Sequence, residues 1–132
     1  MLKATIRQQA DQDWESRDDP QAETPSGVRW KLLVSGERTP PEALTMSIAE
    51  IAPGGKLFSH RHSHAETYYI TSGTGLINID DTESDIGPGA AIFIPGNARH
   101  ETICTSDVPL ASIFIFTFPC DSFDEVIYHY EE

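Results

Sequence analysis

The sequence has few basic residues: 9 Lys and Arg stand against 21 Asp and Glu, which gives a formal net charge of −12. No basic residue follows Arg99, although seven acidic residues do. Because a surface of this sign repels the phosphate backbone of nucleic acids, we expect no nucleic-acid partner and no role as a DNA-binding regulator.

Long apolar runs are also missing. The most apolar stretch, residues 108–118, is 11 residues long and is interrupted by Pro109, Ser112 and Thr117, whereas a membrane-spanning helix needs about 20 apolar residues. The N-terminus lacks the apolar stretch of about 7 to 15 residues that a secretory signal requires. We therefore expect no membrane partner and a cytoplasmic location.

Cysteine is scarce as well. Cys104 and Cys120 show neither CxxC nor another metal-binding spacing, and disulfides are rare in a reducing compartment. We expect two free thiols, with Cys104 as a small filler of the core.

The residues that are present predict a chain of short strands. From Val28 onward, apolar or β-branched runs alternate with Pro, Gly and Asx clusters about every 8 to 12 residues, which is typical of an antiparallel sandwich or small barrel. No run is spaced as an amphipathic helix. Tight turns are expected at Pro53-Gly54, Ser72-Gly73 and Asp80-Asp81. The sequence therefore predicts one all-β domain over residues 28–132, preceded by an irregular N-terminal arm, 1–27.

The histidines are clustered: His60, His62 and His64 are three of only five in the chain. On a strand their side chains would share one face. A turn between His62 and Glu66 would place the histidines and the carboxylate on adjacent strands facing one interior, and His100 begins another β-like run. Imidazole nitrogens and a carboxylate oxygen suit a borderline divalent metal, although the cluster alone could also be a solvated loop with weak metal affinity.

The spacing around these residues resembles the two motifs of the cupin superfamily. The first motif is met by Gly54, His60, His62, Glu66 and Gly73. The second is met by Gly89, Pro95 and His100, with Asn97 and Cys104 in place of the usual Gly and Asn. Asn tolerates a left-handed turn conformation better than most residues, so the first of these departures is compatible with the motif.

The resemblance covers about residues 28–130 and implies a single jelly-roll-like cupin β-barrel. It implies four metal ligands: His60, His62, Glu66 and His100. His64 would then orient a ligand or lie at the rim of the site. The cofactor would be one divalent transition metal, either Fe, Mn, Ni, Co, Zn or Cu, because all of them accept such ligands. Cupins commonly pair through their barrel faces, so we also expect a homodimer.

Finer strings, among them VRWK, AEIAPGG and FPxDxFxEVxY, resemble the small single-cupin dimethylsulfoniopropionate lyases. These enzymes cleave that zwitterionic carboxylate to acrylate and dimethyl sulfide. The resemblance implies two catalytic tyrosines, Tyr68 and Tyr128. Tyr68 shares the strand face of Glu66 and is expected to be the base, while Tyr128 would bind the substrate carboxylate or tune Tyr68. A tyrosine ionises with a pKa of about 10, which a nearby divalent cation can lower.

Two other functions remain open on the sequence alone. The chain could be another metal-dependent cupin enzyme, a dioxygenase or an isomerase, which needs the ligand set but not the tyrosine pair. It could also be a non-catalytic cupin that binds a small carboxylate or a sugar acid. A Tyr68→Phe variant that stays active favours the former, and a stoichiometric ligand without turnover favours the latter.

Overall fold

Strands make up almost all the regular structure of the protein. The computed structural model describes residues 4, 6–16, 26–34, 45–116 and 129–130. Within these ranges there are ten strands and one short 3₁₀ helix, η1 (Gln9–Asp11). No helix among the described residues has the length and apolar character needed to cross a bilayer. The predicted all-β architecture is confirmed.

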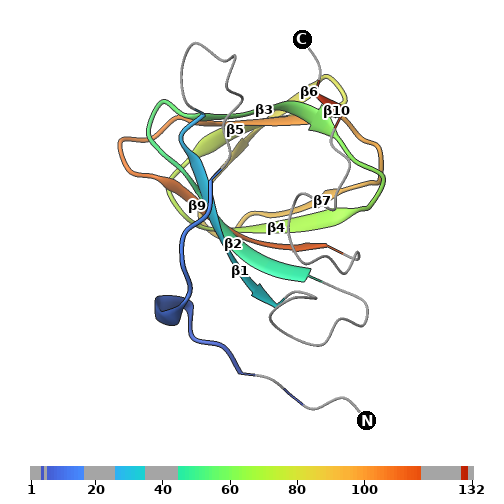
Figure 1. Ribbon diagram of the computed structural model, residues 1–132. Coiled ribbons are helices and arrows are strands. Elements are labelled where there is room, and N and C mark those ends of the chain that lie inside the picture. Colours follow the sequence, from blue (N-terminus) through green and yellow to red (C-terminus); the bar gives the residue numbers. More distant parts are fainter. Residues whose placement is uncertain (1–3, 5, 17–25, 35–44, 117–128, 131–132) are drawn as a thin grey trace.

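The strands form two antiparallel sheets that face each other (Figure 1). The first sheet contains, in spatial order, β1 (Val28–Val34), β2 (Thr45–Ile51), β9 (Leu110–Phe116), β4 (Glu66–Ser72) and β7 (Ala91–Ile94). The second contains β10 (His129–Tyr130), β3 (Lys56–Arg61), β8 (His100–Cys104), β5 (Gly75–Ile79) and β6 (Thr82–Ile86). Consecutive strands often lie in different sheets, so the connections repeatedly carry the chain from one sheet to the other.

Alternation along the strands separates an inner from an outer face. On β4, Glu66, Tyr68 and Ile70 are buried, whereas Thr67 and Tyr69 are exposed. Such a period of two is what a strand with one buried face shows. The inner faces of both sheets meet in one apolar cluster, which includes Ile70, Ile77, Ile94 and Phe114. The polar residues at the ends of β3, β4 and β8 therefore lie at one end of this core.

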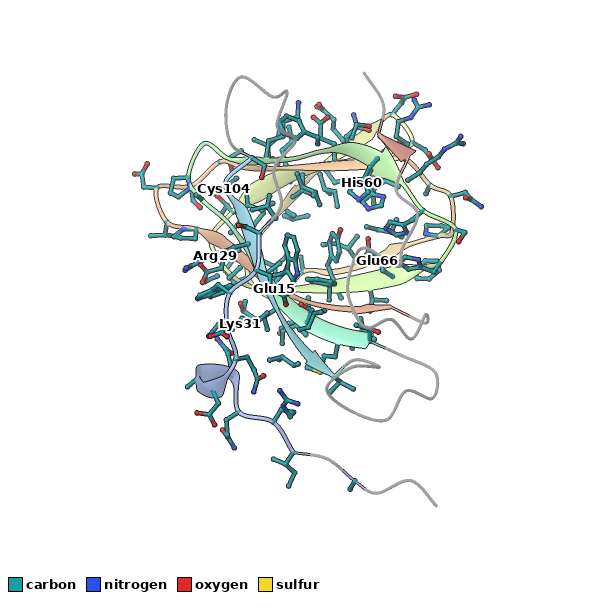
Figure 2. All side chains as sticks on the ribbon, in the orientation of Figure 1. Glu15, Arg29, Lys31, His60, Glu66 and Cys104 are labelled. Carbon is teal, nitrogen blue, oxygen red and sulfur yellow. The ribbon has the colours of Figure 1, made fainter. Side chains whose placement is uncertain are left out.

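The described part of the N-terminal segment packs on the first sheet. Glu15 and Trp30 exchange two backbone hydrogen bonds, of 2.7 and 2.9 Å. The Trp14 ring lies 3.9 Å from the Arg29 guanidinium carbon and 4.9 Å from Lys31 Nζ. Figure 2 shows Glu15, Arg29 and Lys31 together on this side of the protein. Lys31 is consequently only 8% exposed, so residues 9–16 cover the outer face of β1.

The expected turns are present. Asp80 and Asp81, between β5 and β6, have φ of 46° and 69°, the left-handed pair of a tight hairpin turn. Gly54 and Gly73 both have φ of 77°. These turns fix the register of the strands that they join.

Gly73 should tolerate no side chain. A Cβ there would lie 2.3 Å from the Pro109 carbonyl oxygen, whereas at Gly54 it would meet nothing within 4 Å. Since both residues share the same φ, both alanine variants carry about 1 to 2 kcal/mol of left-handed strain, but only Gly73→Ala adds a backbone clash. We expect Gly73→Ala to lower the free energy of unfolding by about 3 kcal/mol or more, and Gly54→Ala by the strain alone. Guanidinium chloride denaturation measures both, and equal losses would contradict the clash.

Candidate metal centre

The two sequence motifs bring four polar side chains to one end of the core. His60, one residue before the end of β3, pairs directly with His100 at the start of β8, so both belong to the second sheet. Glu66 begins β4 in the first sheet. The expectation that Glu66 lies on a strand adjacent to the histidines is therefore wrong in one respect: residues 62–65 cross between the sheets, and Glu66 approaches the histidines from the opposite side.

Each of three histidines is held through its Nδ1 atom. Nδ1 of His60 contacts the carbonyl oxygen of Phe58 at 2.7 Å, that of His62 contacts His64 at 2.9 Å, and that of His100 contacts Ala98 at 2.9 Å. A carbonyl oxygen can only accept, so each Nδ1 must carry the hydrogen. In the neutral ring the lone pair is then on Nε2, which is the arrangement that metal-binding histidines use.

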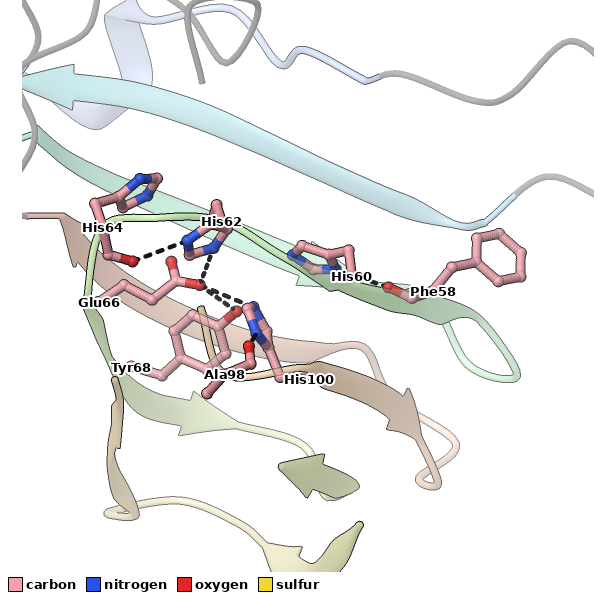
Figure 3. A network of polar contacts seen from close by, with 8 residues as sticks. All are labelled: Phe58, His60, His62, His64, Glu66, Tyr68, Ala98 and His100. Atoms are coloured by element: carbon pink, nitrogen blue, oxygen red, sulfur yellow. Dashed lines mark hydrogen bonds and ion pairs between the residues drawn. The ribbon is translucent and has the colours of Figure 1, made fainter. Parts of the chain in front are cut away.

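The side chains converge on a small polar centre (Figure 3). One ring nitrogen from each of His60, His62 and His100 lies within 4.8 Å of the others. Glu66 Oε1 lies 3.0 Å from His62 Nε2 and 3.1 Å from His100 Nε2. The Tyr68 hydroxyl donates to the same oxygen at 3.1 Å. The structure thus brings together three histidines, one carboxylate and one phenol.

Burial and charge shift the pKa values at this centre. Burial, together with the nearby His100, lowers the pKa of His60 to about 4. Burial would raise the pKa of Glu66, but the contacts with His100 and His62 outweigh it and hold that pKa at about 2. For His62, burial is likewise outweighed by the hydrogen bond and charge of Glu66, and its pKa is raised. The centre therefore pairs an ionised carboxylate with a histidine that readily carries a proton.

The donor set fits a divalent metal. All four side chains are at most 4% exposed. His100 Nε2 lies 3.1 Å from Glu66 Oε1, but without the geometry of a hydrogen bond to it or to another atom of the described residues. A buried nitrogen lone pair without a partner is costly in an apolar setting and is satisfied when it binds a cation. Imidazole and carboxylate together suit first-row transition metals.

The structure also describes the other residues that the sequence analysis named near the site. His64 lies outside the three-histidine group, and its ring stacks on His62 with centroids 4.0 Å apart. Burial and the neighbouring His62 lower the pKa of His64 to about 4. Arg61 and Arg99 are exposed, as strand parity predicts. Asn97 has φ of 65°, the left-handed conformation that explains why Asn can replace Gly there.

Cys104 is a free, buried thiol distant from the centre. It shares the inner face of β8 with His100 but lies four residues further along, or about 13 Å at the usual rise of a strand. Its Sγ donates to the Val108 carbonyl oxygen at 3.4 Å. Figure 2 shows Cys104 at one end of the sheets and His60 and Glu66 at the other. Cys120 and Tyr128 lie outside the described residues.

Sequence reasoning missed the carbonyl groups that orient the histidines. The acceptors belong to Phe58, His64 and Ala98, each two residues from the ring that it holds. Every residue type carries a carbonyl, so no side-chain pattern could have identified these three.

Metal binding should release a proton at mildly acidic pH. Both nitrogens of His62 have acceptors and its pKa is raised above 6.5, so below that raised pKa its Nε2 carries a proton that a metal must displace. His60, with a pKa of about 4, is already neutral at pH 6. We expect proton release on metal binding at roughly pH 6, falling as the pH rises through the pKa of His62, with affinity rising over the same range. An indicator dye in weakly buffered protein measures it on addition of Zn²⁺. Protein already saturated with Zn²⁺ is the control, and no release at pH 6 would contradict the assignment.

Comparison with known proteins places this chain in a family. A family model described as Cupin domain matches residues 47–116. The dimethylsulfoniopropionate lyase DddW of Ruegeria pomeroyi is 35% identical over 103 residues, which cover 78% of this chain and 66% of that protein. Protein SchB of Streptomyces halstedii is 30% identical over 70 residues, or 52% of this chain and 51% of that protein. The chain thus spans less than two thirds of the length of either relative.

The fold is shared with solved structures. The polyketide cyclase RemF of Streptomyces resistomycificus superposes with a TM-score of 0.76 at 20% identity, over 100% of this chain and 87% of that one. At this identity the likeness concerns the fold alone. Because the family match also spans more than half of the 132 residues, the chain belongs to the cupin family.

Proposed function

We propose that the protein is a metal-dependent carbon–sulfur lyase that cleaves dimethylsulfoniopropionate to acrylate and dimethyl sulfide. The observation that carries the proposal is the Tyr68 hydroxyl, which lies 3.1 Å from Glu66 Oε1 beside three converging histidines. The 35% identity to the Ruegeria lyase over 78% of the chain supports it. A buried phenol beside these four side chains is suitably placed to take a proton from a substrate held there, which is the geometry that a general base needs.

His60, His62, Glu66 and His100 would hold one divalent transition metal, either Fe, Mn, Ni, Co, Zn or Cu. Their Nε2 atoms and Glu66 Oε1 supply the nitrogen and oxygen donors that these ions share. When bound, the metal would withdraw charge from a coordinated substrate carboxylate and so make the adjacent C–H more acidic.

Tyr68 would act as the base. Its ionised oxygen takes the proton from the carbon next to the carboxylate, and the electron pair of that C–H bond becomes the double bond of acrylate. The C–S bond breaks, and its electron pair leaves with sulfur as neutral dimethyl sulfide. Tyr68 is 9% exposed, so bulk water is kept from the oxygen and electrostatic effects on it are strengthened.

Aromatic groups could also stabilise the sulfonium. Phe114 packs edge to face with Tyr68, with ring centroids 6.2 Å apart, and a cation is attracted to such a face. Tyr128 stays a predicted second catalytic residue that binds the substrate carboxylate or tunes Tyr68. It precedes β10, which pairs with His60 and Arg61.

Headspace gas chromatography tests the function directly. Wild-type protein loaded separately with each candidate metal is given dimethylsulfoniopropionate near pH 8, and we expect dimethyl sulfide to be released. Absence of the gas with every metal would overturn the lyase assignment. Oxygen consumption or stoichiometric carboxylate binding in the same preparations would then identify a dioxygenase or a binding protein.

A further inference from the structure

Two connections pack backbone to backbone beside the candidate metal centre. Residues 62–65 join β3 to β4, and residues 95–99 join β7 to β8. The Asn97 amide donates to the His62 carbonyl oxygen at 2.7 Å. A Cβ at Gly96 would lie 2.4 Å from the Ser63 carbonyl oxygen. Because the obstructing atom is backbone, a larger residue at position 96 must push the two connections apart.

The same connections supply the acceptors for two of the histidines. The His64 carbonyl holds His62 Nδ1, and the Ala98 carbonyl holds His100 Nδ1, both at 2.9 Å. A shift of either connection therefore moves the acceptor that it carries and turns the ring that this acceptor holds. A histidine binds a metal only when its Nε2 lone pair points at the metal, so small rotations of these rings weaken metal binding.

His64 adds a second restraint on His62. The two rings are stacked at an interplanar angle of 6° with centroids 4.0 Å apart. His64 offers no nitrogen to the three-histidine group. Its ring can thus fix the plane of the His62 ring without competing for a metal.

We infer that Gly96 and His64 are positioning residues that set the metal affinity of the centre through His62 and His100. Gly96 does so by permitting the close contact between the two connections, and His64 does so by stacking. This inference rests on the metal centre of the proposed function and extends it to residues that are not ligands.

Titration with Co²⁺, followed by its visible absorption, tests the inference in the full chain. We expect Gly96→Ala and His64→Ala to bind Co²⁺ about 10- to 100-fold more weakly than wild type and to show an altered absorption spectrum. Gly87→Ala is the matched control, because its Cβ would meet Thr74 Cγ2 at 3.7 Å and the Gly73 carbonyl oxygen at 4.0 Å, both ordinary contacts, and it should bind as wild type. His64→Phe keeps a flat ring and should restore the affinity lost in His64→Ala.

The outcomes distinguish a failure of the positioning roles from a failure of the metal centre itself. Wild-type Co²⁺ affinity and spectrum in both alanine variants would overturn the positioning role while leaving the metal centre intact. Binding as weak in His64→Phe as in His64→Ala would overturn the stacking role. If Gly96→Ala fails to fold, as melting of the metal-free protein would reveal, the His64 pair decides. A wild-type protein that binds no Co²⁺ would overturn the metal centre and this inference with it.

Discussion

Replacing His100 with Gln is expected to remove bound metal and, with it, the proposed lyase activity. His100 Nε2 is buried, lies 3.1 Å from Glu66 Oε1 and has no hydrogen-bond partner in the described residues. Gln is of similar size, but its neutral amide is a weaker ligand for first-row transition metals than imidazole. We expect metal affinity to fall by more than the roughly 100-fold that loss of an outer partner causes. Metal content after dialysis and dimethyl sulfide release measure the two losses.

Glu101→Gln is the matched control for this variant. Glu101 follows His100 on β8 but contacts Lys56 at 3.1 Å, where both side chains are partly exposed. Surface ion pairs contribute about 1 kcal/mol or less, so this variant should keep both metal and activity. Metal should also raise the melting temperature of wild type and of Glu101→Gln, because a ligand that binds only the folded state stabilises it. Undiminished metal content in His100→Gln would contradict the ligand role.

Tyr68→Phe should abolish most of the activity and leave metal binding in place. The change removes one hydroxyl, which donates to Glu66 Oε1, and keeps the ring that packs on Phe114. Loss of a general base costs about 10²- to 10⁴-fold in rate. The expected result is therefore a fall in kcat of that size at unchanged metal content, measured by dimethyl sulfide release.

Tyr69→Phe provides the comparison on the same strand. Tyr69 is the next residue of β4, points to the outer face and is 49% exposed. Loss of its hydroxyl should change neither rate nor metal content. If Tyr68→Phe were to release dimethyl sulfide at the wild-type rate, Tyr68 could not be the base, and another residue would have to take the proton.

Much of the fold follows from local signals in the sequence. Tyr68 was expected on the strand face of Glu66, and the burial of both on β4 agrees. The turn residues Asp80 and Asp81 tolerate positive φ, and both adopt it. These features depend on each residue and its immediate neighbours, which is why the sequence alone reveals them.

The arrangement of the site depended on contacts between distant segments. Nothing near Glu66 in the sequence indicates that it lies in a different sheet from His60. The sheet to which each strand belongs depends on how all the strands pair. The close approach of Gly96 to Ser63 joins residues far apart in sequence. The ligand assignments, the boundary at residue 28 and the homodimer stay predictions.

The contact between Glu15 and Trp30 has a consequence for solubility. β1 is the last strand of its sheet, and an uncovered last strand offers free amides and carbonyls to a strand of another molecule. At Trp30 both backbone groups are already taken by Glu15. At the end of the other sheet, β6 carries the exposed carboxylates Glu83 and Asp85, whose like charges repel a second copy. One end of each sheet is thus protected against the addition of a strand from another molecule, at β1 by a covering segment and at β6 by charge.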